Sequence, residues 1–147
     1  MAIHLPRFFH RFISSPPDPK GTYPDPRLKD VILFATDRCN MRCDHCMFWQ
    51  RIDNPGPEMS LEQLQCIARS SPPLRTLAIT GGEPFLRKDL PDIVETFFRD
   101  NHTHHIQVNT NGVLMDRMDD LVRRGFGSRY ERHLTFQVSL DGLEETH

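Results

Sequence analysis

The 147-residue sequence has no long apolar run and no excess of charge of either sign. No stretch of about eighteen consecutive apolar residues occurs, which excludes a typical transmembrane helix. The N-terminus has neither the apolar core nor the cleavage site of a secretory signal. Eighteen Lys and Arg residues against twenty Asp and Glu residues leave a net charge of −2, which gives no electrostatic indication of binding to nucleic acid or anionic membrane. These absences predict a globular, cytoplasmic protein.

Cysteine is scarce as well, with four residues in the chain. Cys39, Cys43 and Cys46 fall within eight residues, and Cys66 stands apart. Two disulfides are formally possible, but in a chain without an export signal such a cluster favours metal or redox chemistry. We expect Cys66 to pack on the core side of a helix, where buried thiols are usually found.

The first thirty residues differ in composition from the rest. They hold half of the twelve prolines, each of which removes a backbone donor and restricts the preceding residue. Residues 1–30 are therefore predicted to form a flexible, Pro-rich arm whose few apolar residues cover part of the fold. Residues 31–147 are predicted to form the folded unit.

Short apolar runs then alternate with helical patterns. Ser60 and Gln63 form a capping box before a first helix, and Gly125 marks the end of a third. The predicted strands are 31–35, 74–79, 105–108 and 134–140, and the later helices are 89–99 and 115–124. Strands that alternate with helices predict an α/β fold with a parallel sheet, either open or curved toward a barrel.

A polar motif follows each predicted strand. In parallel βα architectures, functional loops gather at the carboxyl ends of the strands. The four motifs, at 36–46, 80–84, 109–112 and 139–142, are therefore expected to converge on one site.

The first motif has the cysteine spacing C-x3-C-x2-C. This spacing allows three thiolates to bind three irons of a cubic cluster and leaves one iron without a protein ligand. Structural zinc is an alternative, although it needs a fourth ligand, and His45 directly beside Cys46 is poorly placed to provide it. A third possibility is that the cysteines form one face of an ordinary helix, against which their polar neighbours argue.

The second motif is Gly81-Gly82-Glu83-Pro84. The glycines allow the backbone to approach a ligand closely and to adopt positive φ. The Glu83 carboxylate can hold a ligand ammonium group, and Pro84 stiffens the exit of the loop.

Taken together, the ordered motifs resemble those of the radical S-adenosylmethionine (radical SAM) superfamily. The resemblance covers roughly residues 31–147, including Thr-Asn-Gly at 110–112 and Ser-Leu-Asp-Gly at 139–142. These loops look like those of the subgroup that contains molybdenum-cofactor biosynthesis and peptide-modifying enzymes. The family fold is a partial TIM-type barrel.

The resemblance implies a 4Fe-4S cluster on Cys39, Cys43 and Cys46, with S-adenosylmethionine on the remaining iron. Reductive cleavage of S-adenosylmethionine then produces a 5′-deoxyadenosyl radical that abstracts hydrogen from a substrate. Electrons come from an external flavodoxin- or ferredoxin-like donor. The residues implied to contact S-adenosylmethionine are His45, at a usually aromatic position, with Gly81, Gly82, Glu83, Pro84, Asn111, Ser139 and Asp141.

The family barrel has about six βα units, whereas this sequence reaches only a fourth strand. We therefore expect the chain to be the N-terminal portion of such an enzyme, with an open sheet edge that a partner chain can cover. The alternative function is a non-catalytic zinc or iron-sulfur module that docks on another protein.

Overall fold

The computed structural model describes residues 29–126, 133–140 and 142. Four strands form one parallel sheet in the order β1-β2-β3-β4. Their bounds are β1 Asp30–Thr36, β2 Thr76–Gly81, β3 His105–Thr110 and β4 Leu134–Val138. The sheet and the intervening helices confirm the predicted α/β fold of parallel βα units.

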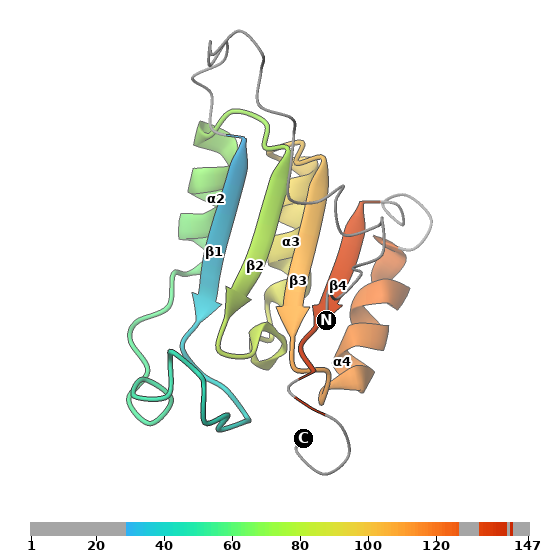
Figure 1. Ribbon diagram of the computed structural model, residues 1–147. Helices are drawn as coiled ribbons and strands as arrows, with labels where there is room; N and C mark the ends of the chain where they lie inside the picture. The colour runs from blue at the N-terminus through green and yellow to red at the C-terminus, as the bar shows by residue number, and fades with distance from the viewer. Residues whose placement is uncertain (1–28, 127–132, 141, 143–147) are drawn as a thin grey trace, which may run out of the picture.

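The helices are α2 Leu61–Ser70, α3 Leu90–Arg99 and α4 Met115–Leu121, with a short 3₁₀ turn, η1, at Pro84–Leu86. Figure 1 shows α2 and α3 behind the sheet and α4 beside β4, and none of these helices lies over the sheet face turned toward the viewer. The predicted capping box is confirmed, because Ser60 accepts from the Gln63 amide and the Gln63 side chain accepts from the Ser60 amide. No helix among the described residues is both long and apolar enough to cross a membrane.

The core lies between the sheet and the helices. Alternate strand residues face it, including the fully buried Leu77, Ile79, Ile106 and Val108. Helix α3 contributes six buried residues: Leu90, Ile93, Val94, Thr96, Phe97 and Phe98. Each buried aliphatic or aromatic side chain stabilises the fold by roughly 1.5–3 kcal/mol relative to exposure. This packing holds the carboxyl ends of the strands, and the loops that follow them, in fixed positions.

Several predicted boundaries need correction. β2 begins at Thr76 rather than Leu74, because the Leu74 amide donates to the Asn101 side chain instead of to a strand. β4 ends at Val138 rather than Leu140, because its partner β3 ends at the paired residue Thr110. The helix after Met115 changes at Val122 into a π-helical segment, η2 Val122–Phe126, instead of continuing as an α-helix to Arg124.

The predicted arm, residues 1–30, lies outside the described residues except for its last two. Of these, Asp30 already belongs to β1. Asp30 also forms an ion pair with Arg75, which joins the beginning of β1 to the segment before β2.

Candidate functional site

The loops that follow the four strands lie at one edge of the sheet (Figure 1). This arrangement follows from the parallel direction of all four strands. The loop after β1, residues 37–60, is the longest and carries Cys39, Cys43 and Cys46. We call it the cysteine loop.

Main-chain hydrogen bonds join the cysteine loop to the glycine motif after β2. The Gly82 amide donates to the Thr36 carbonyl at 2.7 Å, and the Glu83 amide donates to the Arg38 carbonyl at 2.8 Å. The two motifs that the sequence analysis singled out are therefore in direct contact.

This contact explains why both positions are glycine. Gly81 has φ of +130°, and a Cβ there would lie 2.2 Å from the Thr36 carbonyl oxygen. A Cβ on Gly82 would lie 2.1 Å from the Arg38 carbonyl oxygen. Both distances are far below van der Waals contact, and the obstructing atoms belong to the backbone. The positive φ expected for this motif is confirmed at Gly81, and the approach of the two backbone segments is a second reason for glycine that was not found from the sequence.

The three cysteines of the loop are half-buried. The Met41 amide donates to Cys39 Sγ and the Phe48 amide donates to Cys46 Sγ, both at 3.4 Å. Residues 37–60 contain turns but no helix, so the helix-face alternative is wrong. All four cysteines are described and none forms a disulfide, so the disulfide alternative is wrong as well.

Cys43 lines a hollow of about 280 Å³ together with Arg42, Asp44, Trp49 and Ile52. Across the described ranges, no group of three or more His, Cys, Asp or Glu side chains converges as ligands of one ion would. A cubic cluster requires a different arrangement of the cysteines from a single ion. Each thiolate binds a separate iron, so the three sulfur atoms do not converge on one point.

Glu83 is fully buried, and its carboxyl group joins the second loop to the third. Oε1 accepts from the Phe85 amide at 3.1 Å and from the Thr110 hydroxyl at 2.9 Å, while Oε2 accepts from the Asn111 amide at 2.8 Å. The bond to Phe85 also caps the 3₁₀ turn that begins at the buried Pro84. Glu83 therefore braces the site from within the protein.

Asn111 connects the third loop with the cysteine loop. Its Nδ2 donates to Asn40 Oδ1 at 2.8 Å and lies 4.0 Å from Cys39 Sγ. Its Oδ1 accepts from the Val113 amide at 3.0 Å. The structure thus brings together the first three predicted motifs, and a main-chain hydrogen bond from Ser139 to Thr110 joins the beginning of the fourth motif to the third.

The remaining predicted residues lie toward the surface. His45 is exposed in a turn of the cysteine loop. Ser139 is exposed, and its amide donates to the Thr110 carbonyl at 2.9 Å, which holds the end of β4 beside the end of β3. Asp141 lies outside the described residues. Cys66 is exposed on α2, so its predicted packing in the core is wrong.

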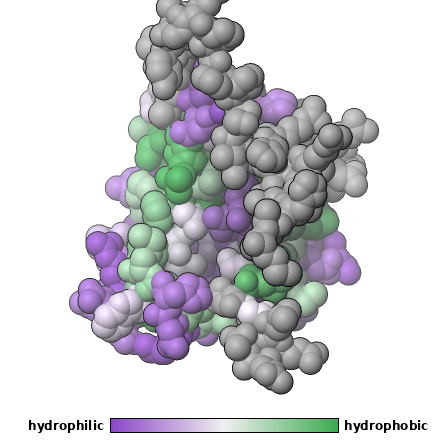
Figure 2. Space-filling model, viewed as in Figure 1, coloured by the Kyte–Doolittle hydropathy of each residue, from purple (hydrophilic) through white to green (hydrophobic). Residues whose placement is uncertain are grey.

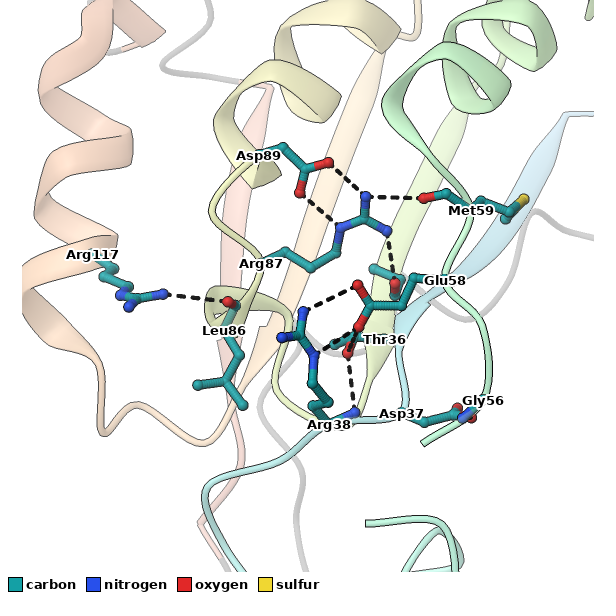
Figure 3. A network of polar contacts seen from close by, with 11 residues as sticks. Thr36, Asp37, Arg38, Gly56, Glu58, Met59, Leu86, Arg87, Asp89 and Arg117 are labelled. Atoms are coloured by element: carbon teal, nitrogen blue, oxygen red, sulfur yellow. Dashed lines mark hydrogen bonds and ion pairs between the residues drawn. The ribbon is translucent and has the colours of Figure 1, made fainter. Parts of the chain in front are cut away.

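A polar network centred on Arg87 holds both ends of the cysteine loop (Figure 3). The Arg87 side chain is only 4% exposed. It donates to the Ala35 carbonyl at 2.9 Å, before the loop, and to the Met59 carbonyl at 3.0 Å, at the end of the loop. It also forms a two-pronged ion pair with Asp89 at 2.9 and 2.6 Å. Arg87 was not identified from the sequence, because nothing in its local pattern marks its partners.

Glu58 forms a second connection in this network. Its carboxylate accepts from the Thr36 hydroxyl at 2.5 Å and from Arg38 at 2.9 and 3.0 Å. Burial acts to raise the pKa of the Glu58 carboxyl, but the hydrogen bonds from Thr36 and Arg38 outweigh it and the pKa is lowered. Glu58 thus stays ionised and ties the end of the loop back to its beginning.

Replacing Arg87 with methionine is expected to lower the free energy of unfolding by about 3 kcal/mol, because it leaves the buried Ala35 carbonyl, the Met59 carbonyl and Asp89 without their donor. The hydrogen bond from Arg87 lowers the pKa of Asp89 below its ordinary value. A lowered folded pKa contributes stability at neutral pH that is lost as the pH falls through that pKa. The difference between wild type and Arg87→Met should therefore shrink from about pH 5 to pH 3 in urea titrations.

Arg123→Met is the matched control, because the ion pair of Arg123 with Asp119 is exposed on both sides. It should cost less than about 1 kcal/mol. An Arg87→Met variant as stable as this control would show that the network does not support the loop.

Comparison with known proteins agrees with this geometry. Residues 33–146 match the family model of the Radical SAM superfamily. A probable GTP 3′,8-cyclase of Archaeoglobus fulgidus is 40% identical over 114 residues, which cover 76% of this chain and 35% of that protein. A GTP 3′,8-cyclase of Xanthomonas axonopodis pv. citri is 32% identical over 124 residues, covering 80% of this chain and 35% of that protein. The chain thus spans about a third of the length of these relatives.

Two solved structures share the fold. One is described as native anSMEcpe with bound AdoMet and Cp18Cys peptide; the TM-score is 0.60 at 23% identity, over 83% of this chain and 34% of that one. The other is BtrN in an open conformation, with a TM-score of 0.50 at 17% identity, over 78% of this chain and 57% of that one. The match of the family model over most of the chain, with the cysteine motif at the end of β1, shows that this chain belongs to the radical SAM superfamily.

Proposed function

We propose that this chain forms the cluster-bearing part of a radical SAM active site. Superfamily members are enzymes that use a 4Fe-4S cluster and S-adenosylmethionine. The observation that carries the proposal is the hydrogen-bonded contact of the glycine motif with the end of β1 and the beginning of the cysteine loop, in which Gly82 bonds to Thr36 and Glu83 bonds to Arg38. It supports a site in which the three thiols and the glycine motif act together, because it ties the loop that carries the thiols to that motif.

The residues present fit a cluster. Backbone amides already donate to the sulfurs of Cys39 and Cys46, and the Asn111 amide group approaches Cys39. Such donors stabilise the negative charge of cluster thiolates and tune the cluster potential. Cys39, Cys43 and Cys46 would hold three irons, and the hollow beside Cys43 leaves space next to the loop.

When bound, the cluster and S-adenosylmethionine supply reductive carbon–sulfur cleavage, yielding a 5′-deoxyadenosyl radical that abstracts hydrogen from a substrate. The chain positions these groups. The main chain at Gly81 and Gly82 would receive the methionine amino group, and the buried Glu83 carboxyl would keep this segment in place. Pro84 would stiffen it. The ribose, carboxylate and adenine contacts would come from His45, Asn111, Ser139 and Asp141.

The reaction also needs partners. A flavodoxin- or ferredoxin-like protein would supply the electron, and the edge of β4, which no strand of the described residues pairs, would be covered by a partner chain.

Anaerobic reconstitution of the chain with iron and sulfide tests this proposal. We expect about four irons per chain and a change in the electron paramagnetic resonance spectrum of the reduced cluster on addition of S-adenosylmethionine. Protein purified under the same conditions without added metal serves as the control. The alternative, a non-catalytic metal-binding module, would be supported by a different result: stoichiometric zinc, no cluster after reconstitution and no response to S-adenosylmethionine.

A further inference from the structure

A hollow of about 170 Å³ lies between the segment 85–91, which leads from η1 into α3, and the helical residues 117–124. Its lining comes from helices and the link between them rather than from the face of the sheet. Phe85 and two apolar residues at the start of α3 form part of the wall. Four lining residues are basic and one is acidic: Arg87, Lys88, Arg117 and Arg124, with Asp120. We call this site the basic hollow.

Arg117 reaches from α4 to η1 at the basic hollow (Figure 3). Its Nη1 donates to the Phe85 carbonyl at 2.7 Å and to the Leu86 carbonyl at 3.4 Å. These carbonyls orient the guanidinium group but do not neutralise its charge. Nε and Nη2 form no hydrogen bond within the described residues, so they remain available as donors to an anion.

The positive charge of the basic hollow is not balanced from within the described part of the chain. Arg87 forms an ion pair with Asp89, so its charge is already matched. The other three basic residues of the lining form no ion pair with any residue in the described ranges, and Lys88 and Arg124 are exposed. Asp120 is the only acidic residue among those that line the hollow. Three unpaired cations against one anion leave a positive surface that carboxylates would complement.

Other surfaces around the proposed site differ in this respect. Each arginine of the cysteine loop has a carboxylate partner: Arg38 with Glu58, Arg42 with Asp53 and Arg51 with Asp37. The sheet face turned toward the viewer in Figure 2 carries an apolar strip on β1 that includes Ile32 and Phe34, 65% and 52% exposed. Of these three surfaces, the basic hollow is the best match to an acidic partner.

Contacts within the protein connect the basic hollow to the proposed cluster site. The Phe85 amide donates to Glu83 Oε1 at 3.1 Å, and Glu83 Oε2 accepts from the Asn111 amide at 2.8 Å. The Asn111 side chain in turn lies 4.0 Å from Cys39 Sγ. Because Phe85 lines the hollow, Glu83 and Asn111 alone separate its wall from a proposed cluster ligand along this chain of contacts. An electron that enters at the hollow would have a short path to the cluster.

An electron donor must also bind without displacing S-adenosylmethionine. None of the residues that line the basic hollow is among those proposed to contact S-adenosylmethionine. A protein bound at the hollow would therefore leave those contacts free. Electron-transfer complexes are typically small and transient, so a few charges around one hollow are enough to orient the donor.

We propose that the basic hollow is the docking surface for the electron donor, an acidic flavodoxin- or ferredoxin-like protein whose carboxylates bind Lys88, Arg117 and Arg124. The proposal rests on the proposed function and adds the place where its redox partner binds. In the transfer, one electron leaves the flavin or iron-sulfur group of the donor, which is oxidised, and enters the cluster, which is reduced. No bond forms or breaks in this step.

The test measures binding of a purified flavodoxin and of a purified plant-type ferredoxin, each chosen for an acidic surface, to the full chain by fluorescence anisotropy. Lys88→Met and Arg124→Met each remove one exposed cation of the hollow. At low salt each should weaken binding of the donor about threefold, and the double variant about tenfold. High salt should remove most of the difference from wild type, because it screens exposed charges.

Two further measurements distinguish docking from a general effect of charge. Asp120→Asn removes the one anion of the lining and should strengthen binding of the donor about twofold. In the reconstituted chain, the rate of cluster reduction by the reduced donor should follow the same order as binding. Photoreduced deazariboflavin, a small uncharged reductant, should reduce the cluster equally fast in every variant.

Arg69→Met is the matched control, because it causes the same change in net charge at an exposed position of α2, outside the hollow. It should bind the donor like wild type, with circular dichroism to confirm the folding of each variant. A double variant that binds the donor as tightly as wild type would overturn the proposal. So would a wild-type chain that binds neither donor at low salt. Failure of wild type to form a cluster would instead count against the proposed function, since the binding measurement does not need the cluster.

Discussion

Cys43→Ala is expected to reduce the iron bound after anaerobic reconstitution from about four atoms per chain to less than half of that value. With only Cys39 and Cys46 remaining, two irons of a cubic cluster would have no protein ligand. Cys43 also lies between the other two cysteines, and its carbonyl accepts the hydrogen bond from the Cys46 amide at 3.0 Å. Because alanine retains this main-chain bond, the turn should persist while the thiolate is lost. Iron and sulfide analysis provides the measurement.

Cys66→Ala is the matched control, because it removes a thiol of the same chain at an exposed position on α2. It should retain the full iron content. The free energy of unfolding before reconstitution should be similar for both variants, since Cys43 is only half-buried. A Cys43→Ala protein that still binds four irons would remove Cys43 from the set of cluster ligands and, with it, the basis of the proposed function.

The arrangement of the loops was predictable from sequence because it depends on periodicity and direction alone. The alternation of strands and helices implies parallel strands, and parallel strands place their following loops at one edge. The capping box at Ser60 was predictable for a similar reason, since both of its hydrogen bonds join residues three positions apart. In each case the relevant information is local in the chain.

The contacts that hold the site together were not predictable, because they join residues far apart in sequence. Arg87 reaches Ala35, 52 positions away, and Glu83 reaches Thr110, 27 positions away. A side chain's local pattern does not specify such a partner. For Cys66, by contrast, a prediction was made from residue type and was wrong. Its residue type suggested burial, whereas the helical phase set by the buried Leu64 and Ala68 places it outside.

Glu83 shows how the structure changes the interpretation of a motif residue. The motif predicts that its carboxylate holds a ligand ammonium group, yet the side chain is fully buried and accepts three hydrogen bonds from within the protein. One of these bonds reaches Asn111, which in turn contacts Asn40. A brace of this kind predicts that changing Glu83 affects folding stability and ligand binding together.

Glu83→Gln is therefore expected to lower the free energy of unfolding by about 2 kcal/mol, because a buried NH2 group would face an amide or hydroxyl donor in place of an acceptor. Displacement of the glycine segment and of Asn111 should also weaken S-adenosylmethionine binding to the reconstituted chain about tenfold. Urea titration and calorimetry measure the two effects. Glu95→Gln, an exposed change on α3, should alter neither by a comparable amount.

Thr110→Val separates a bracing role of Glu83 from direct ligand contact. It removes one hydroxyl donor to Glu83 while leaving the carboxyl group intact. If Glu83 acts as a brace, Thr110→Val should reproduce part of both losses, since the hydroxyl also accepts from the Gly112 amide in the third loop. If Glu83 contacts the ligand directly, Glu83→Gln should abolish binding with little loss of stability, and Thr110→Val should leave binding intact. That second pattern would refute the brace, because a bracing side chain must affect folding stability and ligand binding together.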